Sequence, residues 1–168
     1  MKLSHLLPLL LFLCFGCASS QEEQVSNQNN FPEIVGAVND FEGIFTKSEA
    51  AQLENKSRLH RDTTTEEIVI VTIDNIEPYE DILLFGTELA NYWGVGQEDE
   101  DNGVLIVVSK TQRKMAICLG YGMEDRIGDI KSQEFINHVF IPQFKKGMYF
   151  QGCLEGVNAI MTHLSENP

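Results

Sequence analysis

The sequence is poor in basic residues, and after its first twenty positions it lacks any hydrophobic run long enough to span a bilayer. Lys and Arg number 12 against 25 Asp and Glu, which gives a formal net charge of −13. That charge argues against nucleic acids and anionic membrane surfaces as electrostatic partners. The chain also lacks phosphate-loop, dinucleotide-binding, kinase and nucleophile-elbow motifs, and its histidines show no zinc-type spacing.

Cysteine is scarce, and its four residues fall into two groups. Cys14 and Cys17 lie in an apolar N-terminal leader, whereas Cys118 and Cys153 lie in the part predicted to fold. In an exported protein the second pair could form a disulfide. Cys118 falls in a predicted buried strand, however, where it is also explained as a small core residue. We therefore favour free thiols.

Residues 1–20 have the features of a bacterial export signal. Leu6–Phe15 is an apolar segment too short to span a bilayer as a mature helix. Phe15–Ala18 resembles a lipobox in which Cys17 is acylated, and cleavage by an ordinary signal peptidase is the alternative. We predict that residues 1–17 are a lipoprotein signal peptide with its acylated Cys17. The lipid would hold the exported protein on a membrane of the bacterial cell envelope.

The next segment, residues 18–30, is rich in Ser, Gln, Glu and Asn and has almost no apolar residues, which predicts a flexible tether. The folded domain should cover residues 31–166. Helices are predicted there at about 46–62, 82–93, 132–140 and 149–164. Thr46 and Glu49 form a capping box that opens the first helix, and Pro142 should close the third.

Strand predictions rest on two uninterrupted apolar segments and a third that follows a short polar turn. Ile68–Ile73 is β-branched throughout and predicts a buried central strand. Val104–Val108 and Met115–Leu119 predict an antiparallel hairpin over about 103–119, with Asn102 opposite Tyr121. The alternation of helices with buried strands predicts an α/β fold, namely a three-layer α/β/α sandwich with a small mixed sheet. The strands at 68–73 and 104–108 should be parallel.

The hairpin also carries a family resemblance. The residues concerned are Asp101–Val108, the Arg113-Lys114 turn and Gly120–Asp125 with a later Asp, together with Val38–Phe41, Trp93–Gly96, Pro142 and Phe144. They resemble the TPM domain over about residues 35–164. That family includes bacterial membrane-associated proteins and plant thylakoid-lumen proteins linked to photosystem repair, some of them described as acid phosphatases. The resemblance implies the same fold and a site near these motifs.

Acidic residues flank the predicted hairpin at one edge of the sheet. Asp101, Asn102 and Asp129, with Asp40 as an outside candidate, offer the hard oxygen ligands that Ca²⁺ or Mg²⁺ prefers. The alternative is that Asp101 and Asn102 belong to a turn and that Asp129 caps the following helix.

The pocket around these ligands should be completed by Gly120, Tyr121, Gly122 and Glu124. Glycine at two of these positions would let a ligand approach the backbone, or would only relieve strain at a strand end. This edge lies opposite the carboxyl ends of the parallel strands, where α/β sheets usually bind ligands.

Two functions fit this pattern. One is a lipid-anchored envelope module that binds an unidentified protein partner during assembly or repair, with a divalent cation in its acidic pocket. The other is a metal-dependent acid phosphatase acting on phosphomonoesters, in which the cation offsets the repulsion between carboxylates and phosphate. The absence of a recognisable nucleophile, general base or histidine at the site favours the binding module.

Overall fold

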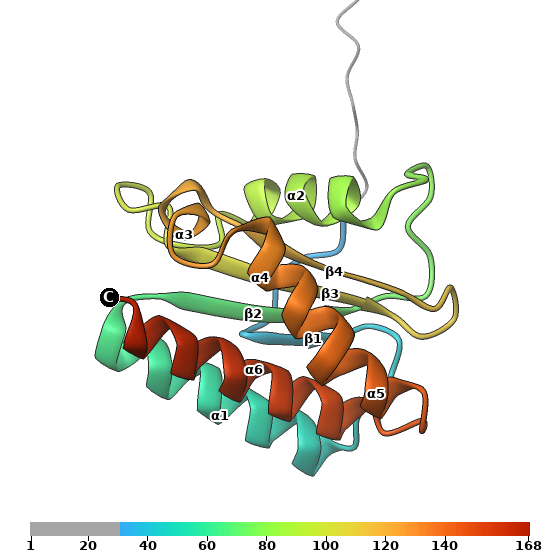
Figure 1. Cartoon of the computed structure of the whole chain (residues 1–168). Coiled ribbons are helices and arrows are strands. Elements are labelled where there is room, and N and C mark those ends of the chain that lie inside the picture. Colours follow the sequence, from blue (N-terminus) through green and yellow to red (C-terminus); the bar gives the residue numbers. More distant parts are fainter. Residues whose placement is uncertain (1–30) are drawn as a thin grey trace, which may run out of the picture. The chain divides into compact units, whose positions relative to one another are not determined.

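A mixed sheet forms the centre of the domain. The computed structural model describes residues 31–168, and the sheet has the strand order β1-β2-β3-β4. The strands are β1 (Val38–Asp40), β2 (Glu67–Thr72), β3 (Gly103–Ser109) and β4 (Lys114–Leu119). The first three are parallel, and β4 is antiparallel to β3. The predicted mixed sheet is thus confirmed, with the short β1 as a strand that the sequence did not predict (Figure 1).

The hairpin has the predicted register. Val104 pairs with Leu119 and Ser109 with Lys114, and the turn closes through a bond from the Arg113 N–H to the Lys110 carbonyl. Beyond the strands, the Gly120 N–H donates to the Gly103 carbonyl at 2.8 Å. This bond continues the same alignment beyond the last strand pair, and Tyr121, which was predicted to lie opposite Asn102, begins the helix α3 (Tyr121–Glu124). Two apolar runs around one polar turn were sufficient to fix the alignment, because a slip by one residue would turn every side chain to the other face.

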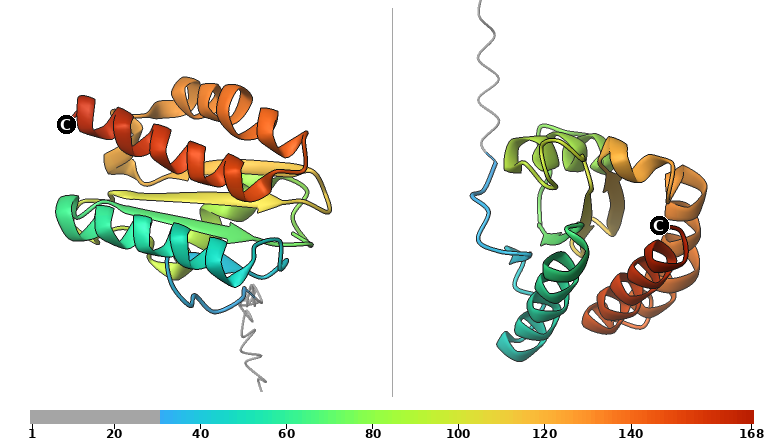
Figure 2. Two further views of the ribbon diagram at one scale, coloured as in Figure 1. Left: turned by 90° about the horizontal axis from the view of Figure 1, so that it is seen from below. Right: turned by 90° about the vertical axis from the view of Figure 1, so that its left-hand side faces the viewer.

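Helices cover both faces of the sheet, as the predicted sandwich requires (Figures 1 and 2). On one face lie α1 (Lys47–Thr64), α6 (Tyr149–Glu166) and the run α4 (Gly128–Phe135), η1 (Ile136–Phe140) and α5 (Ile141–Phe144). On the other lies α2 (Ile82–Trp93), and the short α3 (Tyr121–Glu124) follows β4. Alternate residues of β2 divide accordingly, since Ile68 and Ile70 join the core under α1 and α6, whereas Val69 and Val71 join the core under α2.

The helix boundaries confirm one prediction and correct another. The capping box is present, with the Thr46 side chain accepting from the Glu49 N–H and the Glu49 carboxylate from the Thr46 N–H. The expected helix at 132–140 is wrong in its bounds, because it begins at Gly128 and passes through the π-helical turn η1 into α5. Pro142 does not close it, since this residue lies in the first turn of α5, directly after the π-helical turn η1.

Two further predictions concern thiols and membranes. Cys118 and Cys153 are buried and free, so the free-thiol interpretation is confirmed. Within residues 31–168 no helix has the length and apolar character needed to cross a membrane. The predicted signal peptide, Cys17 and the tether lie outside the described residues.

Candidate functional site

An acidic pocket of about 300 Å³ lies at the edge of the sheet where β3 begins and β4 ends. One wall is α2, and the hairpin and the segments after it form the rest. Five of the predicted site residues line it, namely Asp101, Gly120, Tyr121, Glu124 and Asp129. Chain segments far apart in sequence are therefore brought together here. No Lys, Arg or His of the described residues lines this pocket.

Glycines let two backbone segments meet beneath the pocket. A Cβ atom at Gly120 would lie 2.1 Å from the Asp101 carbonyl oxygen, and one at Gly122 would lie 2.1 Å from the Glu100 carbonyl oxygen. Both separations are far below contact distance, so any side chain there would push the loop before β3 away from α3. The space beside these glycines is occupied by the protein's own backbone, and Gly122 does not line the pocket.

The three carboxylates occupy different local settings. Asp101 has a left-handed backbone (φ 48°) at the end of the loop before β3, a conformation that Asp and Asn tolerate better than most residues. Glu124 ends α3, and Asp129 lies in the first turn of α4. The N-cap position of α4 is Ile127, so Asp129 is inside the helix and is not its cap. All three side chains belong to exposed residues.

Asn102 is buried and holds the loop. Its Oδ1 accepts from the Gln97 N–H at 2.9 Å, and its Nδ2 donates to the Thr65 carbonyl at 3.2 Å and to a Glu100 carboxylate oxygen at 2.7 Å. It does not line the pocket. These contacts are those of the turn residue that the sequence offered as the alternative to a metal ligand.

Asp40 lies at the opposite edge of the sheet, because it ends β1 while Asp101 precedes β3 and the two strands run the same way. Its carboxylate accepts from the Ile44 and Phe45 N–H groups at 3.0 and 2.9 Å and from the Thr72 hydroxyl. Asp40 therefore organises the connection from β1 to α1. It is not brought together with Asp101, Glu124 and Asp129.

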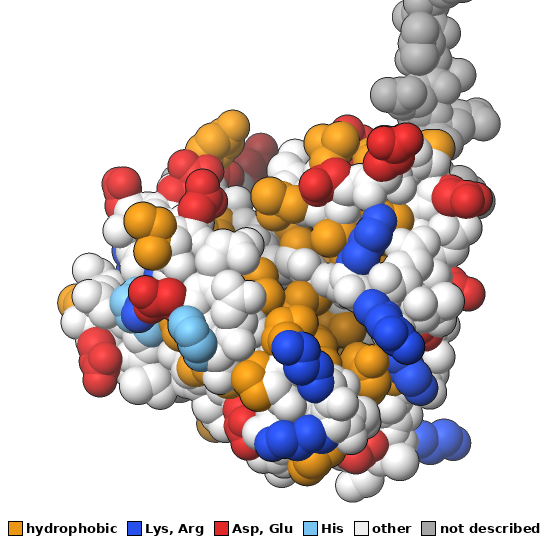
Figure 3. All heavy atoms as spheres, turned by 45° about the vertical axis from the view of Figure 1, so that its right-hand side comes forward, with side chains coloured by type: hydrophobic (Ala, Val, Ile, Leu, Met, Phe, Trp, Pro, Cys, Tyr) orange, Lys and Arg blue, Asp and Glu red, His pale blue; other side chains and the backbone are white. Residues whose placement is uncertain are grey.

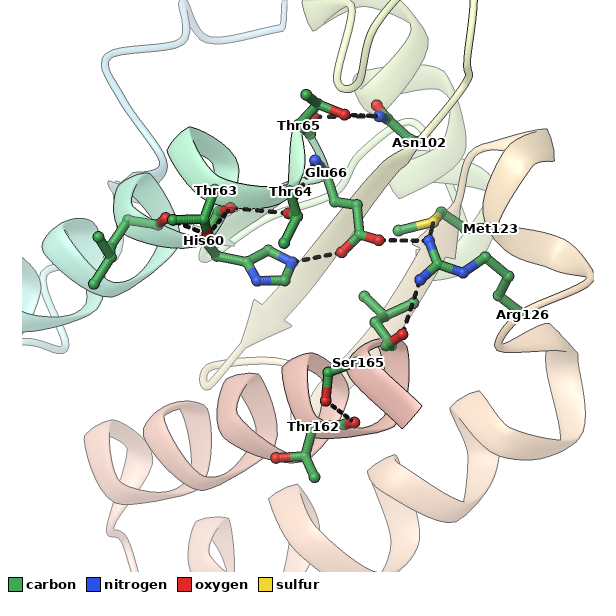
Figure 4. A network of polar contacts seen from close by, with 12 residues as sticks. His60, Thr63, Thr64, Thr65, Glu66, Asn102, Met123, Arg126, Thr162 and Ser165 are labelled. Carbon is green, nitrogen blue, oxygen red and sulfur yellow. Dashed lines mark hydrogen bonds and ion pairs between the residues drawn. The ribbon is translucent and has the colours of Figure 1, made fainter. Parts of the chain in front are cut away.

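A largely buried polar network stabilises the edge of the sheet at which the acidic pocket lies (Figure 4). Glu66 precedes β2, and its carboxylate lies 2.7 Å from Nε2 of His60 in α1 and forms an ion pair with Arg126 after α3. The Arg126 guanidinium also donates to the carbonyls of Leu164 and Asn167, both at 2.9 Å. Arg126 therefore ties α3 to α1 and α6. Because these partners are up to sixty residues apart in the chain, no sequence spacing could have signalled them.

The lining of the pocket also includes one thiol, besides the hydroxyl groups of Thr87 and Tyr121. The Cys118 thiol lines it, and its sulfur lies 3.7 Å from the Leu83 carbonyl oxygen. Burial raises the pKa of Cys118 to about 12. The thiol therefore stays protonated at neutral pH, and only a thiolate is an effective nucleophile. Ser109 lies at the other end of β3 and does not line this pocket.

The donor set suits a divalent cation, but not a compact cage. Carboxylate oxygens are the ligands that Ca²⁺ and Mg²⁺ prefer. Among residues 31–168, however, no three His, Cys, Asp or Glu side chains converge closely enough to hold an ion. A cation here would be bound by one or two carboxylates and would keep water molecules in its remaining positions, as Mg²⁺ commonly does.

Comparisons with known proteins define the family. The TPM domain matches residues 38–163. No curated protein matches the chain significantly. The N-terminal domain of a P. gingivalis protein, solved by NMR, is 31% identical with a TM-score of 0.71, covering 77% of this chain and 82% of that one.

Two further NMR structures share the fold. A protein of the psychrophilic bacterium Bizionia argentinensis is 21% identical with a TM-score of 0.66, and the match covers 76% of this chain and 86% of that one. The N-terminal domain of a Corynebacterium glutamicum protein is 14% identical with a TM-score of 0.61, over 82% and 84% of the two chains. The family match spans most of the sequence, including every residue of the acidic pocket, and the chain therefore belongs to the TPM domain family.

Proposed function

We propose that the protein is a binding module of the bacterial cell envelope, anchored by a lipid on Cys17, whose acidic pocket takes a partly hydrated divalent cation and contributes to recognition of a protein partner. The observation that supports the pocket's role is the gathering of Asp101, Glu124 and Asp129 around one cavity with no basic side chain in its lining. Uncompensated carboxylates repel one another, and a cation relieves that repulsion. The anchor rests on the sequence pattern around Cys17.

Binding is favoured over phosphomonoester hydrolysis by what lines the pocket. Among residues 31–168, no histidine lines it and no basic side chain is there to neutralise phosphate, and its thiol is protonated at neutral pH. Arg126, which follows α3 in the chain, is directed to Glu66 and to the Leu164 carbonyl of α6. Hydrolysis would thus depend wholly on the cation. Any phosphatase activity should disappear with EDTA and with loss of the pocket carboxylates.

Thermal unfolding with and without millimolar Ca²⁺ or Mg²⁺ tests the cation site. An ion that binds only the folded state stabilises it by about 2.7 kcal/mol at a hundredfold excess over its Kd. For a domain of this size the melting temperature should rise by several degrees. Asp101→Asn combined with Asp129→Asn should abolish the rise, and without the ion the variant should be as stable as wild type or slightly more stable. Asn also tolerates the left-handed backbone at position 101.

The matched control removes the same two charges elsewhere. Asp62 and Asp74 are exposed and do not line the pocket. Asp62→Asn with Asp74→Asn should leave the cation-dependent rise intact. If neither ion moves the transition of the wild-type protein, or if the control loses the rise as fully as the pocket variant does, the cation site is wrong.

A further inference from the structure

A second cavity, of about 610 Å³, lies at the opposite edge of the sheet, and we call it the basic groove. It is formed by the β3–β4 turn on one side and by α5 with the loop before α6 on the other. Four basic residues line it: Lys110, Arg113, Lys114 and Lys145. Figure 3 shows the hollow, with a hydrophobic floor and Lys and Arg side chains along its rim.

The charge of the basic groove contrasts with that of the whole chain. No Asp or Glu of the described residues lines it, although the sequence has 25 acidic residues against 12 basic ones. None of its four basic side chains forms an ion pair within residues 31–168. The Lys110 ammonium lies over the Tyr149 ring at 5.7 Å, and the Lys114 ammonium donates to the Glu80 carbonyl. Within residues 31–168 these four charges are therefore not neutralised by side-chain ion pairs, and the neighbouring Glu42 carboxylate accepts instead from the backbone N–H groups of Lys110 and Thr111.

The floor of the basic groove is apolar. Met115, Ile141, Phe144 and Tyr149 line it, and each is partly exposed. The rings of Phe144 and Tyr149 stack with their centroids 4.9 Å apart. A bare phosphate or carboxylate ion would leave this floor uncovered. A ligand that matches both features carries negative charge and an apolar, preferably aromatic, group.

The groove also lies where α/β folds commonly bind ligands. Ser109, at the carboxyl end of the parallel strand β3, forms part of its lining, and ligands of open α/β sheets bind outside that end of the strands. Local backbone geometry shapes the far wall. Gly147 has a left-handed backbone (φ 76°) that allows the chain to turn from α5 into α6.

We propose that the basic groove binds an acidic peptide segment of a partner protein, one in which Asp or Glu alternates with aromatic or aliphatic residues. Acidic side chains would meet the lysine and arginine rim, and apolar side chains would cover Phe144 and Tyr149. An anionic lipid surface offers similar chemistry, but a bilayer would face a protein of net charge −13. A short peptide experiences mainly the local field, because exposed charges are screened over about 8 Å at physiological salt. This site does not depend on the cation pocket.

Fluorescence anisotropy of a labelled peptide of alternating Glu and Phe, with purified full-length protein, tests the proposal. The peptide should bind, and a higher salt concentration should lower its affinity. Lys110→Gln with Lys145→Gln should weaken binding about tenfold, since exposed charge pairs are individually modest. Lys47→Gln with Lys56→Gln removes the same charge from α1 and should leave the affinity unchanged.

Changes to the peptide test both halves of the ligand without altering the protein. Replacing Phe by Ser, or Glu by Gln, should each abolish measurable binding. The proposal is overturned if the peptide does not bind, if the groove variant binds it as tightly as wild type, or if the Ser peptide binds equally well. Vesicles of phosphatidylcholine and phosphatidylserine should not bind to the groove. Binding of these vesicles that is lost in the groove variant, without peptide binding, would make the ligand an anionic lipid.

Discussion

Single polar residues set the shape of the acidic edge. Asn102 uses both ends of its amide on the loop before β3, and Glu66 bridges His60 and Arg126. A buried polar group whose partner is removed keeps its desolvation penalty. These side chains therefore influence the pocket through the backbone that they hold, and the exposed carboxylates can change without disturbing it.

The buried thiols should make the free energy of unfolding fall as the pH rises in the alkaline range. Burial raises the pKa of Cys153 and of Cys118 to about 12, whereas a cysteine in an unfolded chain ionises near pH ~8.5. The contribution of each thiol is therefore fully present below pH ~8.5 and is lost as the pH rises towards 12. Each thiol should lower the free energy of unfolding by up to ~1.4 kcal/mol per pH unit in that range.

Urea unfolding of Cys153→Ala and wild type at neutral pH and near pH 10 checks this. Loss of the buried thiol should make the variant less stable at neutral pH. The difference should shrink at the higher pH, because only the wild type carries this ionisation. A difference that stays constant with pH would mean that the Cys153 thiol ionises equally well in the folded protein.

At the scale of whole elements, prediction succeeded where the signal was local. The capping box at Thr46 set the start of α1, and two apolar runs set the hairpin register. Strand β1 was missed because its three residues carry no alternating pattern. The helix around η1 was misplaced because Pro142 suggested an end, and a π-helical turn has no sequence signature.

The candidate site was also predicted only in part from the sequence. Register alone placed Asp101 near the segment after β4, and the pocket indeed contains Asp101, Glu124 and Asp129. Asp40 lies elsewhere because it is the last residue of β1, the strand that was not predicted. The basic groove was not foreseen, since its rim joins Lys110 to Lys145 through tertiary packing.

The contact between α6 and η1 depends on one glycine. A Cβ at Gly156 would lie 1.9 Å from Cζ of the fully buried Phe140. Gly156→Ala should therefore destabilise the fold by about 1–3 kcal/mol through overpacking, which outweighs the ~1 kcal/mol that Ala gains over Gly in a helix. Thermal or urea unfolding measures the change. Asn158→Ala, at an exposed position of the same helix, is the control and should be neutral or slightly stabilising.

For the molecule as a whole, the proposed lipid anchor determines where the domain acts. Cys17→Ser removes the acylation site, so the protein should appear in the soluble envelope fraction or remain unprocessed. The measurement is fractionation after a high-salt and carbonate wash, with Cys118→Ser as a control that leaves Cys17 intact. Retention of the Cys17→Ser protein on washed membranes would contradict the anchor.

Strand β3 connects the two cavities, since Gly103 lines the acidic pocket and Ser109 lines the basic groove. Its seven residues, at ~3.3 Å each, separate the two ends by ~20 Å. That distance exceeds the screening length of ~8 Å at physiological salt. Occupants of the two sites should therefore neither compete nor cooperate. Calorimetric titration of the peptide should give the same Kd with and without saturating cation. The domain would then act as an adaptor whose two ends bind their ligands independently.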